Sequence, residues 1–255
     1  MFQTIIKNYN QHSHESFNPR VVLFDMDGVL YDSMPNHAIA WTKAMGHFGL
    51  PFTEEDAYAT EGAKGVDTIR IYAQKLLAKQ LSETEAAQMY KLKAEYFHQM
   101  PQPKIFNGVK ELMHVIKSEG LQIGIVTGSA QRQLIDRLLS DFHEFITPEQ
   151  VTTAFDVKNG KPAPDPYLAG LRKAGNLAPH EGIVIENAPL GIQAGTNAGC
   201  FTIAVNSGPL SNEILLEKNP QLLYPSIEKL FVDWPTLIAE AKYKQTDKMN
   251  IKKTQ

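Results

Sequence analysis

Two aspartates, Asp25 and Asp27, directly follow the apolar run Val-Val-Leu-Phe at 21–24, which has the composition of a buried strand. In open α/β sheets, ligands bind beyond the carboxyl ends of the strands, so both carboxylates are expected at a ligand-binding edge. Two acids placed this close repel each other unless a cation or a shared proton neutralises them. The pair therefore indicates a site for a divalent metal ion and a phosphoryl group.

Three further polar segments follow predicted strands and are expected at the same edge of a parallel sheet. They are Thr127-Gly128-Ser129, Lys161 and Glu186-Asn187. Backbone amides at a helix start and an ammonium group bind phosphate oxygens. A metal ion neutralises charge, and a carboxylate attacks phosphorus as a nucleophile. Together with the two aspartates, these segments predict phosphoryl transfer.

The elements that position these residues alternate along the second half of the chain. Strands are expected at 122–126, 151–155, 182–185, 201–205 and 222–224, and helices at 107–119, 129–140 and 164–174. This alternation predicts a parallel, doubly wound α/β sheet. Residues 35–100 have only helical patterns and predict an inserted α-helical cap on a core of residues 1–34 and 101–255. Residues 1–19 are expected to be a polar leader and residues 242–255 a flexible, lysine-rich tail.

Composition restricts the classes of function. A formal net charge of −3 over 255 residues gives no general attraction to nucleic acid or to an anionic membrane surface. No apolar run approaches the ~20 residues needed to span a bilayer. The single cysteine, Cys200, excludes an internal disulfide framework and is typical of the reducing cytoplasm. We therefore expect a cytoplasmic protein without nucleic-acid or membrane partners. A monomer or a weak homo-oligomer is also expected, although composition does not bear on that state.

The four segments together resemble the four motifs of the haloacid dehalogenase-like (HAD) phosphotransferases. The first motif is similar to Asp25-Met26-Asp27-Gly28-Val29, and Thr127, Lys161 and Glu186-Asn187 stand where the second, third and fourth motifs are expected. The match runs from about residue 21 to 209, and the helical insertion resembles the cap of the β-phosphoglucomutase-like subgroup. The resemblance implies a Rossmann-like core with an α-helical cap.

The resemblance also implies roles for individual residues. Asp25 is expected to be the nucleophile that forms an aspartyl phosphate, and Asp27 the general acid and then the base. Thr127 and Lys161 are expected to hold the transferring phosphoryl group. Substrate contacts are expected from two residues after the second motif and from four residues of the cap. For the cap residue His37 the alternative is a buried histidine with satisfied hydrogen bonds, and for Lys93 it is a solvated lysine. These six are Gly128, Ser129, His37, Glu61, Lys64 and Lys93.

The implied cofactor is Mg²⁺, with one departure from the family pattern. Its expected ligands are the Asp25 carboxylate, the Asp27 backbone carbonyl and the side chain of Asn187, with Glu186 behind them or acting through a water molecule. The fourth motif usually ends in Asp, so Asn187 supplies an oxygen ligand without a charge. The cap residue Glu61 is a candidate for restoring the missing carboxylate, and a solvated loop glutamate is the alternative.

Two further departures from the family pattern affect the binding of a second phosphate, which a mutase must hold on the sugar while the first is transferred. Mutases of the subgroup carry an arginine just after the cap glycine, whereas this chain reads Gly62-Ala63-Lys64-Gly65, and lysine is a point charge without a bidentate fork. Ala130 also replaces the first of two basic or amide-bearing residues after the second motif. We therefore predict a Mg²⁺-dependent phosphatase for a small phosphorylated metabolite or inorganic pyrophosphate. The alternatives are a β-phosphoglucomutase, interconverting β-glucose 1-phosphate and glucose 6-phosphate, and a catalytically inactive metabolite-binding protein.

Overall fold

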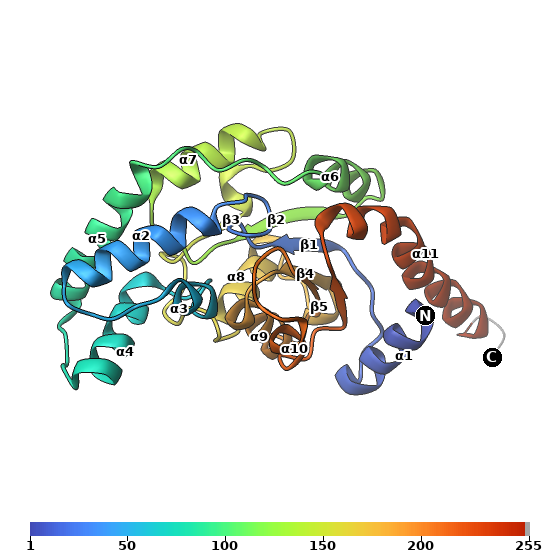
Figure 1. Ribbon diagram of the computed structural model, residues 1–255. Coiled ribbons are helices and arrows are strands. Elements are labelled where there is room, and N and C mark those ends of the chain that lie inside the picture. The colour runs from blue at the N-terminus through green and yellow to red at the C-terminus, as the bar shows by residue number, and fades with distance from the viewer. Residues whose placement is uncertain (253–255) are drawn as a thin grey trace.

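Six parallel strands form one sheet in the order β3-β2-β1-β4-β5-β6 (Figure 1). The computed structural model describes the backbone of residues 1–252 and the side chains of residues 1–242. The order reverses direction at β1, which is the switch point where open α/β sheets bind ligands. The strands are β1 (Val21–Phe24), β2 (Gln122–Val126), β3 (Val151–Thr152), β4 (Gly182–Glu186), β5 (Phe201–Val205) and β6 (Leu222–Tyr224).

Helices cover both faces of the sheet because alternate strand residues point to opposite sides. Val22 and Phe24 of β1 belong to one large apolar cluster, and Val21 and Leu23 belong to a second. The first cluster also contains residues of α1 (Phe2–Ser13), α6 (Val109–Ser118), α7 (Arg132–Asp141) and α11 (Ile227–Lys252). The second contains residues of α8 (Asp165–Lys173) and α9 (Pro189–Asn197), and α10 (Asn212–Leu216) packs beside α9. The predicted doubly wound parallel sheet is confirmed.

The expected cap is a group of four helices beyond the carboxyl ends of the strands (Figure 1). These helices share an apolar cluster of their own, which includes Trp41, Phe52 and Ile69. Two of them begin at a capping box, in which Thr53 or Ser82 exchanges hydrogen bonds with the residue three positions later. The cap helices are α2 (Met34–His47), α3 (Glu54–Ala59), α4 (Gly65–Leu77) and α5 (Glu83–His98).

The expectation of a polar leader at residues 1–19 was wrong. Phe2, Ile6 and Tyr9 recur at helical spacing, lie buried in the large cluster of the sheet, and make α1 part of the core. The Tyr9 hydroxyl donates a hydrogen bond of 2.7 Å to the carbonyl oxygen of Gly199. The expected flexible tail is corrected in part, because α11 continues through Lys252, and residues 253–255 lie outside the described residues.

Two element boundaries near the sheet edge differ from those predicted from the sequence. The strand expected at 151–155 ends at Thr152, because the Asp156 carboxylate accepts hydrogen bonds from the backbone and hydroxyl of Thr153 and folds a turn there. The helix expected from Ser129 begins at Arg132, so the residues after the second motif form a loop. In the part of the chain that the structure describes, no helix is long and apolar enough to cross a membrane.

Truncating the buried face of α1 is expected to destabilise the core. Ile6 is 1% exposed, so Ile6→Ala removes buried methylene groups and leaves a cavity, at a cost of about 2–5 kcal/mol in the free energy of unfolding. Lys7→Ala, on the exposed side of the same helix, is the matched control and should change stability little. Urea denaturation of both variants measures the difference. Equal stability of the two variants would show that α1 is not part of the folded core.

Candidate active site

The sheet topology brings the motif residues together at the end of β1. Phe24 is paired with Ile125 of β2 on one side and with Ile185 of β4 on the other. The residues at the carboxyl ends of these strands therefore lie side by side at the switch point, and among them are Asp25, which follows β1, and Glu186, the last residue of β4. The predicted gathering of the four motifs at one edge has its physical cause in this register.

A buried ammonium group joins the first, third and fourth motifs. Lys161 Nζ contacts Asp25 Oδ1, lies 2.5 Å from Glu186 Oε1, and donates a hydrogen bond of 3.1 Å to the carbonyl oxygen of Val126. The side chains of Lys161, Asp25 and Glu186 are at most 4% exposed. Burial raises the pKa of Asp25 to about 8, and the two carboxylates outweigh the burial of Lys161 and raise its pKa. One ammonium group thus faces two buried carboxyl groups.

The Glu186 carboxylate supports this ammonium group and is not itself at the cavity. Its Oε1 also accepts a hydrogen bond of 2.7 Å from the Tyr167 hydroxyl. Its Oε2 accepts hydrogen bonds from the backbone N–H groups of Asn187 and Ala188, at 3.0 and 3.2 Å. A Cβ atom on Gly191 would lie 1.8 Å from Oε1, so only glycine leaves room for the carboxylate there. Four donors occupy both oxygens of Glu186, which fixes Lys161 and the backbone after β4.

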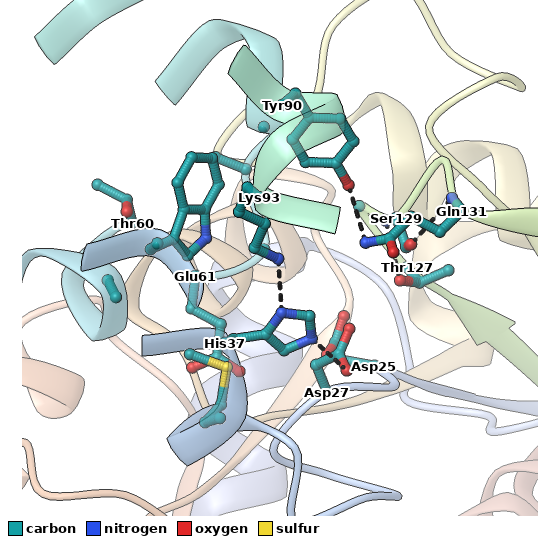
Figure 2. Close-up of a pocket in the computed structure, with 17 residues that line it drawn as sticks. Asp25, Asp27, His37, Thr60, Glu61, Tyr90, Lys93, Thr127, Ser129 and Gln131 are labelled. Carbon is teal, nitrogen blue, oxygen red and sulfur yellow. Dashed lines mark hydrogen bonds and ion pairs between the residues drawn. The ribbon is translucent and has the colours of Figure 1, made fainter. Parts of the chain in front are cut away.

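A chain of hydrogen bonds runs from Asp27 into the cap (Figure 2). Asp27 Oδ1 accepts from Ser33 Oγ at 2.6 Å and lies 3.1 Å from His37 Nε2, while Lys93 Nζ lies 2.6 Å from His37 Nδ1. Burial and the charge of Lys93 lower the pKa of His37. Because an ammonium group can only donate, His37 Nδ1 accepts from Lys93, and Nε2 is left to donate to Asp27. Burial lowers the pKa of Lys93 to about 8.

These neighbours keep the carboxyl group of Asp27 ionised. Burial favours the protonated acid, but the contacts with His37 and Ser33 and the charge of Lys93 outweigh it and lower the pKa of Asp27 to about 2. The Lys93 ammonium lies 5.1 to 5.9 Å from the ring centres of Trp41, Tyr90 and Phe97, which surround it with aromatic faces. These contacts therefore favour the ionised form of Asp27 in this arrangement.

The cap reaches the fourth motif through Glu61. Glu61 Oε1 accepts a hydrogen bond of 2.8 Å from Asn187 Nδ2, and burial raises the pKa of Glu61 well above its ordinary value. The oxygen of the same amide group, Asn187 Oδ1, is buried and has no hydrogen-bond partner. A Cβ atom on Gly28 would lie 2.0 Å from Asn187 Nδ2, so the glycine of the first motif makes room for this pair. The cap is closed on the core at this point.

Eight of the expected site residues line one cavity between cap and core, with a volume of about 60 Å³. They are Asp25, Asp27, His37, Glu61, Lys93, Thr127, Gly128 and Ser129. Lys161, Glu186 and Asn187 lie behind the cavity wall. Lys64 does not reach the cavity, because its ammonium group donates to the carbonyl oxygens of Val157 and Lys158, at 2.6 and 2.8 Å.

Sequence reasoning missed several polar residues that line the cavity, among them Tyr90 and Gln131. Gln131 Nε2 donates a hydrogen bond of 3.3 Å to the Tyr90 hydroxyl, while Gln131 Oε1 is buried without a partner (Figure 2). Gln131 stands one position after Ala130, where the second amide-bearing or basic residue of the motif is expected. Tyr90 precedes Lys93 by three residues on α5, a spacing that places both on one side of the helix. Both signals were present in the sequence.

Comparisons with known proteins decide the family. The model of the haloacid dehalogenase-like hydrolase family matches residues 22–205. The chain belongs to this family. Hexitol phosphatase A of Escherichia coli K12 is 32% identical over 213 residues, which cover 82% of this chain and 92% of the relative. The β-phosphoglucomutase of Bacillus subtilis 168 is 25% identical over 84% of this chain and 95% of the relative.

A solved structure is also similar to nearly the whole chain. It is a Bacteroides vulgatus protein provisionally assigned as a β-phosphoglucomutase, 44% identical, with a TM-score of 0.90 over 94% of this chain and 98% of that chain. The family, the cap subgroup and the fold class predicted from the motifs are confirmed. This haloacid dehalogenase-like chain is an enzyme of the hydrolase and phosphotransferase kind.

Because Glu186 packs tightly against Gly191 of α9, adding one methyl group at position 191 is expected to destabilise the protein. Gly191→Ala is expected to displace the carboxylate from Lys161, and the loss of a partner for a buried charge costs about 3 kcal/mol in the free energy of unfolding. Gly46→Ala, in α2 with no atom within 4 Å of the added Cβ, is the control and should stabilise by about 0.5–1 kcal/mol. Thermal unfolding measures both. Wild-type stability of Gly191→Ala would contradict the assigned role of Glu186.

Proposed function

We propose that this enzyme is a Mg²⁺-dependent phosphohydrolase for a small phosphorylated compound, and that inorganic pyrophosphate is the first substrate to test. The names of its relatives span sugar phosphatases and a phosphoglucomutase, so the choice rests on the cap. A cytoplasmic location and a monomeric or weakly oligomeric state stay predictions.

The observation that carries the proposal is the packing at Gly65. A Cβ atom on Gly65 would lie 2.2 Å from the ring of Tyr90, so no larger side chain fits there while the cap is closed. In the mutases of the subgroup an arginine is expected in this same cap segment, just after the glycine that is Gly62 here. The neighbouring cation, Lys64, is engaged by two backbone carbonyl oxygens. The cap loop therefore offers no cation to a second phosphate, and a small cavity favours a short substrate.

Charge supports a divalent cation at the first and fourth motifs. Four carboxyl groups gather there, Asp25, Asp27, Glu61 and Glu186, against two ammonium groups, Lys161 and Lys93. When all four acids are ionised, four negative and two positive charges give the site a net charge of −2, which one Mg²⁺ ion would neutralise. Among residues 1–242, no cluster of three or more Asp, Glu, His or Cys side chains forms a metal site by itself.

The unpartnered oxygen of Asn187 fits such an ion. Mg²⁺ takes oxygen ligands, and a buried amide oxygen without a donor is one. The Asp25 carboxylate, the Asp27 backbone carbonyl and Asn187 Oδ1 would hold the ion, and Glu61 stands next to them as a further carboxylate. The bound ion would neutralise the charge of the phosphoryl oxygens and of Asp25.

The side chains then divide the reaction into two steps. An oxygen of Asp25 forms a bond to phosphorus while the bond to the leaving oxygen breaks, and Lys161 and Thr127 stabilise the phosphoryl oxygens. A polyanionic substrate raises the pKa of Asp27, which enters protonated and gives its proton to the leaving oxygen. Asp27 then takes a proton from water as the water oxygen attacks phosphorus. This attack releases phosphate and restores Asp25.

Loss of the nucleophile tests the proposed function. Asp25→Asn is expected to lower phosphate release from pyrophosphate on the order of 10⁴-fold or more, because an amide cannot act as the nucleophile of the covalent step. Asp136→Asn, on the exposed side of α7, is the matched control and should keep wild-type turnover. Phosphate release is followed with a panel of pyrophosphate, hexose phosphates and nucleotides.

The same panel separates the alternatives. Isomerisation of β-glucose 1-phosphate, primed by a bisphosphate and faster than any phosphate release, would establish the mutase and contradict the proposal. No turnover of any compound with Mg²⁺ would favour a metabolite-binding protein instead. Release from pyrophosphate with no isomerisation is the expected result.

The contact of Glu61 with Asn187 predicts a specific change in metal dependence. Glu61→Gln keeps the shape but removes the charge, and the Mg²⁺ concentration for half-maximal activity is expected to rise roughly tenfold. Glu55→Gln, at an exposed position of α3, is the control and should leave the Mg²⁺ requirement unchanged. Titration of activity with Mg²⁺ gives both values. An unchanged Mg²⁺ requirement in Glu61→Gln would show that this carboxylate has no part in the metal site.

A further inference from the structure

The cap loop at residues 60–65 is fastened to the core by a lysine that makes no contact with the cavity. Lys64 Nζ donates hydrogen bonds to the carbonyl oxygens of Val157 and Lys158, at 2.6 and 2.8 Å. These carbonyls belong to the core loop that leads into Lys161. Hydrogen bonds from an ammonium group are roughly twice as strong as neutral ones, so this contact is a strong link between cap and core.

Three glycines allow the two loops to approach this closely. A Cβ atom on Gly160 would lie 2.8 Å from Lys64 Cγ, and one on Gly128 would lie 2.4 Å from the carbonyl oxygen of Gly62. A Cβ atom on Gly62 would lie 3.1 Å from Lys161 Cδ. The cap loop is therefore seated between the second and third motifs, directly against the stem of the lysine that holds Asp25.

The same loop separates two spaces. Thr60 and Ala63 line the active-site cavity and also a larger cleft of about 1100 Å³ between cap and core. Lys161 lines the larger cleft but not the cavity. The segment from Thr60 to Lys64 is thus the wall between the cavity and the larger cleft, and Lys64 holds the end of that wall.

We propose that Lys64 is a positioning residue: its ammonium group locks the cap loop onto the loop of Lys161 and keeps the wall between cavity and cleft closed. In this closed position Glu61 meets Asn187 and Gly62 rests on Lys161. Lys64 touches neither the cavity nor the reacting groups, so it acts only through the two loops. Without the lock the cap opens more often, and water reaches the cavity.

Distance measurements on the free enzyme test the lock without any substrate. Nitroxide labels at Lys79→Cys on the cap and Glu213→Cys on the core report opening, and the native Cys200 is only 1% exposed. Lys64→Met keeps most of the stem, removes the ammonium group, and is expected to shift the ratio of closed to open molecules by roughly 10- to 100-fold. Lys64→Arg should restore the closed distance, and Lys43→Met, an exposed lysine of α2, should leave it unchanged.

A second variant perturbs the contact of Lys64 with the core loop by a substitution in that loop. Gly160→Ala places a methyl group against Lys64 Cγ and is expected to produce the same longer distances with the lysine intact. A wild-type distance distribution in Lys64→Met overturns the proposal, and so does a wild-type distribution in Gly160→Ala. Circular dichroism of each variant confirms that the fold is retained.

The kinetic expectation rests on the proposed phosphohydrolase function, whereas the distances do not. With pyrophosphate, KM of Lys64→Met should rise roughly tenfold while kcat changes less than about twofold, because substrate-bound enzyme still closes. A fall in kcat with unchanged KM would overturn the positioning role. If Lys64→Met shows the longer distances but the wild type does not hydrolyse pyrophosphate, the role of Lys64 is supported and the proposed substrate is rejected.

Discussion

The buried contact of one ammonium group with two carboxyl groups is the interaction on which the rest of the site depends. Lys161 is held between Asp25 and Glu186, with almost no exposure to solvent. Such a cluster is stable only if every remaining polar atom has a partner, and here Tyr167 and the backbone after β4 complete Glu186. The parallel register of three strands and the close approach of α9 at Gly191 both serve this requirement.

The cap acts on this cluster from the other side. It brings a third carboxyl group, that of Glu61, to Asn187, the uncharged residue that ends the fourth motif. It also fills space, because the Tyr90 ring occupies the volume that a side chain at position 65 would need. Under the proposed function, closure of the cap therefore affects both the affinity for Mg²⁺ and the size of the substrate.

The sequence predicted the parts of the site that follow from topology. Parallel strands must place their carboxyl ends at one edge, so the meeting of Asp25, Lys161 and Glu186 needed no further information. The directions of cap side chains were harder, because a helical repeat shows which residues share a face but not what the face meets. Lys64 was expected at the substrate and instead points to the core loop, and Tyr90 was not expected at the cavity. The first helix was missed because its three buried residues are spread through a polar segment.

The central claim is that the closed cap accepts two adjoining phosphoryl groups and has no place for a second phosphate across a hexose. Calorimetric titration of the Mg²⁺-loaded enzyme with imidodiphosphate and with glucose 1,6-bisphosphate tests it most directly. Imidodiphosphate keeps the size and charge of pyrophosphate but resists hydrolysis. The account predicts that it binds at least about tenfold more tightly than the bisphosphate, a difference of about 1.4 kcal/mol. Equal or tighter binding of the bisphosphate would contradict the account.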